Sequence, residues 1–158
     1  MQAQVQASSI PDHSLLRSYC DAGAFADCYF IDVDEPIDME TFVTSFYTTR
    51  LFKLERLILK WAVAKPSIDD QARQVAAGDR DDFAAWTVEQ RADDQLLMCD
   101  LSNRTRSWFM VGSIPGGTRL HFGSAVVPVR DPKSGRATLG GVFTALAWIP
   151  QNLFAAAA

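Results

Sequence analysis

Two polar residues, Arg106 and His121, stand out because strand pairing predicts that both lie on one otherwise apolar sheet face. Side chains alternate between the two faces of a strand, and tight hairpin turns carry one face from strand to strand. An arginine fork can hold a carboxylate or phosphate, and a histidine can donate, accept or transfer a proton near neutral pH. The pattern therefore indicates the wall of a binding pocket, without naming a ligand.

The predicted face depends on three turn sequences between Phe83 and Val129, which are Ala92-Asp93-Asp94, Ser102-Asn103 and Pro115-Gly116-Gly117. Such sequences join antiparallel strands, so the segment reads as four strands. Tight turns place Trp86 and Val88 opposite Cys99 and Leu97, and the same pairing extends across the next two strands. The candidate ligand-binding residues on this face are Arg106, His121, Trp86, Trp108, Met110 and Cys99.

Each candidate also has a purely structural interpretation. A buried histidine can simply bond a backbone group, and aromatic residues on alternating strand positions are often plain core. Arg106 would need an internal acid such as Glu55, Asp32 or Asp100 if it bound no ligand, because an unpaired buried charge is costly.

Acid–base chemistry is a second functional interpretation. His121 with Glu55 or Asp100 would give a cyclase- or hydrolase-type enzyme. The chain lacks a nucleophile elbow, a phosphate loop and a dinucleotide fingerprint. We therefore expect a non-catalytic binding protein for a small apolar or amphipathic molecule, with an apolar lining and with Arg106 and His121 orienting a polar or anionic end.

The opposite sheet face is also apolar, because Phe109, Leu120 and Phe122 fall on it by alternation. A sheet with one solvated face alternates apolar and polar residues more cleanly. Either the helices expected between residues 38 and 77 cover this face, or a second copy does, giving a homodimer. A third functional interpretation is a structural or partner-binding domain that uses the Phe109–Phe122 face.

Composition limits the remaining classes. The chain has 158 residues, a net charge of −4 and a pI near 5.0, which argues against general nucleic-acid binding. Three cysteines and two histidines lack metal-ligand spacing, so we expect reduced thiols, no metal, no cofactor and a cytoplasmic location. Residues 138–158 carry no charge and show helical sidedness, which predicts a buried helix; a membrane anchor is the alternative.

The order of elements predicts an α+β fold. A strand over 25–33 is followed by helices over about 38–47, 51–64 and 67–77, then the four strands and a long final helix. This order, from Phe25 to Phe154, resembles the helix-grip arrangement of the START-like and polyketide-cyclase-like superfamily. The resemblance implies a curved antiparallel sheet packed on the C-terminal helix, with an apolar ligand between them. We expect residues 1–24 to be loosely ordered and residues 25–158 to form one domain.

Overall fold

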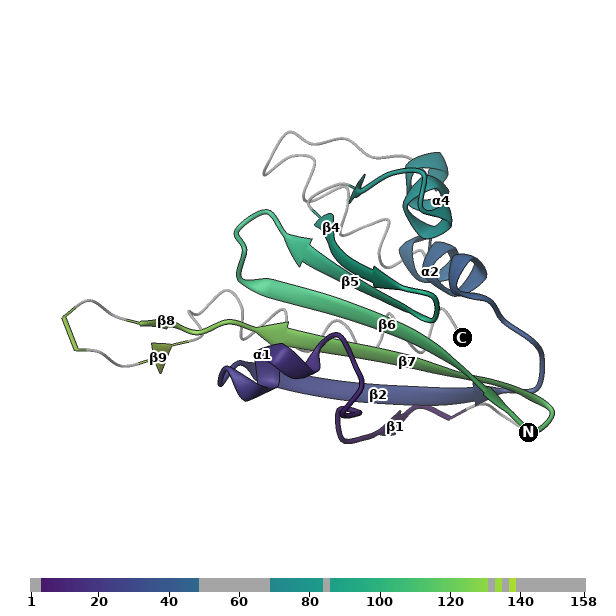
Figure 1. Cartoon of the computed structure of the whole chain (residues 1–158), viewed down its shortest axis with the longest axis horizontal. Coiled ribbons are helices and arrows are strands. Elements are labelled where there is room, and N and C mark those ends of the chain that lie inside the picture. The colour runs from purple at the N-terminus through teal and green to yellow at the C-terminus, as the bar shows by residue number, and fades with distance from the viewer. Residues whose placement is uncertain (1–3, 49–68, 84–85, 131–132, 135–136, 139–158) are drawn as a thin grey trace.

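The computed structural model describes residues 4–48, 69–83, 86–130, 133–134 and 137–138. Its centre is a seven-stranded antiparallel sheet with strand order β1-β2-β7-β6-β5-β4-β3 (Figure 1). The strands are β1 (Gln6–Ala7), β2 (Phe25–Val33), β3 (Asp82–Phe83), β4 (Trp86–Ala92), β5 (Gln95–Asp100), β6 (Thr105–Ile114) and β7 (Gly117–Val126). A separate two-stranded hairpin joins β8 (Val129–Arg130) to β9 (Ala137–Thr138). The helices are α1 (Arg17–Asp21), α2 (Met39–Thr48) and α4 (Asp69–Ala77), so the α+β class is confirmed.

The meander from β4 to β7 is connected by the turns that the sequence predicts. Ala92 pairs with Gln95 across the Asp93–Asp94 turn, and Ile114 pairs with Gly117 across Pro115–Gly116. Gly116 has φ +83°, which a Pro-Gly turn requires at its second central residue. Asn103, in the middle turn, has φ +58°, a conformation that asparagine tolerates better than most residues. Local turn chemistry therefore positions these four strands.

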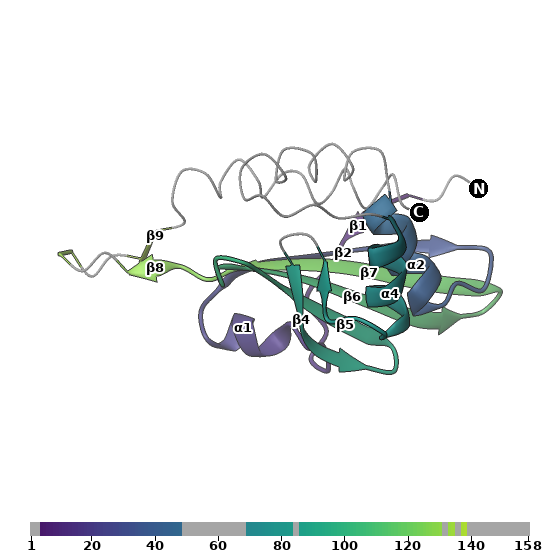
Figure 2. The ribbon, with the colours of Figure 1, turned by 90° about the horizontal axis from the view of Figure 1, so that it is seen from above.

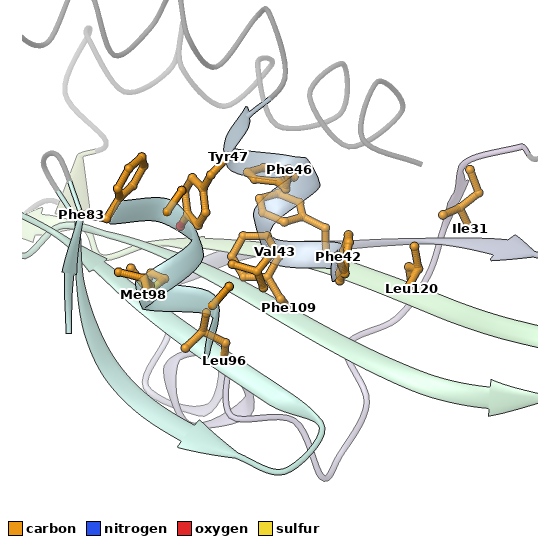
Figure 3. Close-up of a cluster of buried hydrophobic side chains, with 14 of the residues drawn as sticks. Ile31, Phe42, Val43, Phe46, Tyr47, Phe83, Leu96, Met98, Phe109 and Leu120 are labelled. Carbon is orange, nitrogen blue, oxygen red and sulfur yellow. The ribbon is translucent and has the colours of Figure 1, made fainter. Parts of the chain in front are cut away.

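One face of the sheet is covered by α2 and α4. Asp38 caps α2, because its Oδ1 accepts the Thr41 backbone N–H at 2.7 Å. The Phe46 ring stacks on Phe122, with centroids 4.9 Å apart, and meets Phe109 edge-on at 4.9 Å. Figure 3 shows Phe42, Val43 and Phe46 of α2 gathered with Phe109. Gly78, with φ +90°, follows the end of α4.

These contacts decide between the two covers considered for the Phe109–Phe122 face. Phe109 is fully buried and Phe122 is 1% exposed, beneath helices of the same chain. The helical cover is therefore the one found. The sequence argument for a dimer assumed an uncovered face, so that argument no longer applies; the homodimer and the use of this face by a partner stay predictions.

The opposite face is covered by the N-terminal segment, which we call the strap and define as residues 9–24. Figure 2 shows its helix, α1, on one side of the long strands. Leu16 is fully buried and joins Cys28, Leu97, Trp108, Met110 and Ala125 in a second apolar cluster. Leu16 and the hydrogen bonds of Leu15 and Tyr19 hold the strap to strands far along the chain. The division into a loosely ordered segment 1–24 and a domain 25–158 stays a prediction.

Several expectations lie outside the described residues. They include the second helix with Glu55, the start of the third helix, and the C-terminal segment 139–158. No helix within the described ranges is long and apolar enough to cross a membrane.

Candidate functional site

The pairing of β4 with β5 moves Trp86 away from the predicted pocket face. Trp86 pairs with Asp100 and Val88 with Met98, one position out of step with the expected pairing. The register shifts between Val88 and Gln90, so Glu89 forms a β-bulge. Trp86 and Val88 consequently pack against the cluster under α2. The prediction that Trp86 shares a face with Arg106 was wrong, because a one-residue insertion exchanges the two faces of a strand.

The other five candidates do lie on one face, since Leu97 pairs with Trp108, Cys99 with Arg106, and Met110 with His121. Arg106 is 5% exposed, Trp108 fully buried, Met110 5% exposed and His121 9% exposed. Cys99 is half-buried. The sequence therefore placed the central part of this face correctly, and among the described residues it is the strap that covers this face.

Arg106 is neutralised inside the protein by an acid that the sequence reasoning missed. Its Nε lies 2.7 Å from Glu89 Oε2. Simple alternation along β4 would have put Glu89 on the opposite face, and only the bulge turns its carboxylate towards Arg106. Of the acids considered, Asp32 binds Arg119 and Asp100 binds the Arg104 and Thr105 backbone N–H groups.

Two neighbours complete the cluster around Arg106. Asn103 Oδ1 accepts a bond of 2.6 Å from Arg106 Nη2, and Tyr19 Oη on the strap accepts one of 2.9 Å from Nε. The guanidinium also lies 4.6 Å from the centre of the Tyr19 ring, while Tyr19 Oη donates to Glu89. Cys99 Sγ lies 3.3 Å from Asn103 Oδ1, and burial raises the pKa of this thiol. With these partners, Arg106 is an internal ion pair rather than a free anion receptor.

The middle of the face is filled by the chain itself. Gln95 Oε1 accepts the Trp108 Nε1–H at 2.8 Å and the Leu15 backbone N–H at 2.9 Å. A methyl group added at Gly123 would stand 2.9 Å from both Leu16 Cδ2 and Trp108 Cε3. Glycine at this position therefore leaves the notch that Leu16 occupies. The structural interpretation of Trp108, as core with a satisfied N–H, is the one the geometry favours.

His121 is different, because its Nδ1 is buried and has no hydrogen-bond partner among the described residues. Its ring lies 6.1 Å from the Trp108 ring and 6.0 Å from the Phe30 ring, measured between centroids. Burial is the main cause that lowers the pKa of His121 to about 4; the charges of Arg119 and His13 lower it further, and Asp32 opposes them. At neutral pH the imidazole is therefore uncharged, with one donor and one acceptor nitrogen.

The surroundings of His121 contain a complete ion pair and a glycine on the neighbouring strand. Arg119 binds both oxygens of Asp32, at 2.7 and 2.8 Å, and its guanidinium lies 4.2 Å from the centre of the Phe30 ring. On the neighbouring strand, a methyl group at Gly112 would meet nothing nearer than the Arg119 carbonyl oxygen at 3.9 Å. This end of the face thus combines aromatic walls, a neutral imidazole and a glycine at which a methyl group would make only an ordinary van der Waals contact.

Arg106 and His121 do not form one site. Met110, the partner of His121, is four positions after Arg106, which corresponds to about 13 Å along a strand. Asp100 lies farther still, next to the β5–β6 turn, so it cannot exchange a proton directly with His121. Glu55 lies outside the described residues.

Comparisons of the chain with protein-family models, with curated proteins and with solved structures give no match. The site must therefore be interpreted from its own chemistry.

Proposed function

We propose that this protein binds a small amphipathic molecule without transforming it, and that His121 holds the uncharged polar end of that molecule. The observation that carries the proposal is the buried Nδ1 of His121, which has no partner among the described residues. A buried polar atom is almost always hydrogen-bonded in a folded protein, so we expect a bound molecule to supply a hydrogen-bond partner for His121 Nδ1. A ligand hydroxyl, amide or protonated carboxyl group would supply it.

The surroundings favour an amphipathic ligand. The rings of Trp108 and Phe30 flank the imidazole and offer apolar contact. The cations nearby are already engaged, since Arg119 holds Asp32 and Arg106 holds Glu89. Among the described residues, Arg119 and Arg106 thus leave no unpaired cation for an anionic head group at this position, so a neutral head group fits better than the anionic one expected from the sequence.

Binding is preferred to catalysis because the described residues give His121 no proton-transfer partner. With its pKa lowered to about 4, the imidazole is a weak base at neutral pH. The oxygens of Asp32, the acid whose charge acts on His121, are both bound by Arg119. An acid–base enzyme that uses His121 remains the second candidate, with Glu55 as its possible acid.

The helix-grip arrangement also remains a proposal. It is supported by element order, in which β2 precedes the helices and pairs with β7, the last long strand. Contacts between residues 139–158 and the sheet, measured by nuclear Overhauser effects, would test it.

Native mass spectrometry of freshly purified protein tests the binding function, because a retained small molecule adds a defined mass. We expect wild type and the surface control His13→Gln to retain it and His121→Leu to lose it. Equal retention by His121→Leu would contradict the role of His121. Absence of retained mass, together with failure to bind Nile red, an uncharged amphipathic dye, would contradict the binding function itself.

A further inference from the structure

The strap is fixed at both ends on the same strand, β2. Before it, β1 pairs Gln6 with Phe30 and Ala7 with Tyr29, and the Ser8 N–H reaches the Cys28 carbonyl oxygen at 2.9 Å. At its end, Gly23, with φ +86°, turns the chain into β2. Figure 1 shows α1 crossing beside β2 and β7 between these two ends. A segment tethered at both ends can lift and return without losing its register.

The apolar hold of the strap on the sheet is narrow. Leu16 is its one fully buried apolar side chain, and α1 contains no buried residue. Ile10, Leu15 and Tyr19 are only partly buried against the cluster. By contrast, α2 buries Phe42, Val43, Phe46 and Tyr47 on the other face. Segments with few buried apolar contacts open more readily than the core on which they lie.

The polar contacts of the strap are also separable from the sheet. Arg106 keeps Glu89 and Asn103 when Tyr19 leaves, because both partners belong to the sheet and its turns. Gln95 likewise keeps its bond to Trp108 when the backbone of Leu15 leaves. Lifting the strap therefore leaves the charge of Arg106 paired. An unpaired buried charge would have made opening too costly in free energy.

We infer that the strap is a lid, latched by Tyr19 on the Glu89–Arg106 pair, and that Leu16 occupies the place taken by the apolar body of the ligand. This inference rests on the proposed function. Gly123, beneath Leu16, is two residues from His121 along β7, a separation of about 7 Å. A molecule with a neutral polar head and an aliphatic or aromatic body spans these two positions. The ligand therefore binds only after Leu16 has moved away from Gly123, and the strap limits the access of the ligand to this face of the sheet.

Hydrogen–deuterium exchange of the intact chain tests the lid without any ligand. Tyr19→Phe removes the latch hydroxyl, and Tyr29→Phe, on the face under α2, is its matched control. Loss of about one hydrogen bond should speed exchange of the amides in residues 15–24 by about fivefold in Tyr19→Phe. Exchange in β6 and β7 should not change, and Tyr29→Phe should match wild type in the strap. Acceleration of β6 and β7 together with the strap, or no acceleration of the strap, would overturn the lid.

Fluorescence titration with Nile red tests the competition with Leu16. Leu16→Ala and Tyr19→Phe should each bind the dye at least about fivefold more tightly than wild type, since less of the closed state must be displaced. Unchanged or weaker binding in both would overturn the lid as a gate. His121→Leu separates the two proposals. If Tyr19→Phe speeds hydrogen exchange in the strap but His121→Leu does not change the affinity for the dye, the lid is supported and the proposed head-group site is contradicted.

Discussion

The burial of His121 makes stability depend on pH in a specific direction. The pKa is lowered to about 4 in the folded protein, chiefly by burial, from the ordinary value of 6.5. At a pH between these two pKa values, His121 is protonated in the unfolded chain and unprotonated in the folded protein. Stability is therefore full above about pH 6.5 and declines as the pH falls towards about 4. His121→Gln, which keeps a neutral hydrogen-bonding side chain, should lack this decline.

The magnitude follows from the two pKa values. Each unit of difference corresponds to about 1.4 kcal/mol, so the shift of His121 from 6.5 to about 4 is worth about 3 kcal/mol when complete. Between about pH 7.5 and about pH 4.5, wild type should lose about 2.5 kcal/mol more unfolding free energy than His121→Gln. Carboxylates that titrate in this range are common to both proteins and cancel in the comparison.

Urea unfolding, followed by tryptophan fluorescence at several pH values, measures this difference. The chain contains two histidines, so His13→Gln is a natural control and should keep most of the decline, because burial of His121, and not the charge of His13, is the main cause of its lowered pKa. Parallel pH profiles for wild type and His121→Gln would refute the burial of a neutral imidazole, and with it the basis of the proposed site.

Three further predictions concern stability and are measured by urea unfolding. Glu89→Gln should lower the free energy of unfolding by about 3 kcal/mol, because it leaves the buried charge of Arg106 without its carboxylate. Arg106→Met should lower it by only about 1 kcal/mol, because the Glu89 side chain is 31% exposed and water can reach it. Equal losses would contradict this asymmetry. Gly123→Ala should destabilise by about 2 kcal/mol, because the added methyl group would stand 2.9 Å from the Asp27 carbonyl oxygen, from Leu16 and from Trp108. Gly112→Ala should stay within about 0.5 kcal/mol, and similar effects at both glycines would argue against the notch. Phe122→Lys should cost more than about 3 kcal/mol, because the side chain is buried under α2, and light scattering that shows only a change from dimer to monomer would contradict this helical cover.

Much of the sheet could be predicted from the sequence because its signals are local. The strand from Phe25 to Val33, the cap at Asp38 and the turn at Pro115–Gly116 each depend on residues within a few positions of one another. Alternation along β6 and β7 then placed Arg106, Trp108, Met110 and His121 on one face, because the turns fix the register of a hairpin.

The partner of Arg106 could not be predicted in the same way. Glu89 is one extra residue in β4, and the sequence of β4 contains no signal that predicts a bulge at this residue. The position of the bulge depends on how β4 fits against β5. That single residue turns Trp86 to the other face and brings Glu89 to Arg106. Alternation predicts faces correctly only up to such an irregularity.

From the sequence alone, the strand over residues 25–33, the four strands of the meander, their turns and the face shared by Arg106, Trp108, Met110 and His121 could be predicted. Tertiary structure alone decided what covers that face. Leu15 reaches Gln95 across 80 residues, and Tyr19 reaches Arg106 across 87. Leu16 fits over Gly123 because a missing side chain on one strand leaves room for a leucine from the strap. Contacts of this kind depend on the complementary shapes of distant segments, which no local pattern of residues encodes.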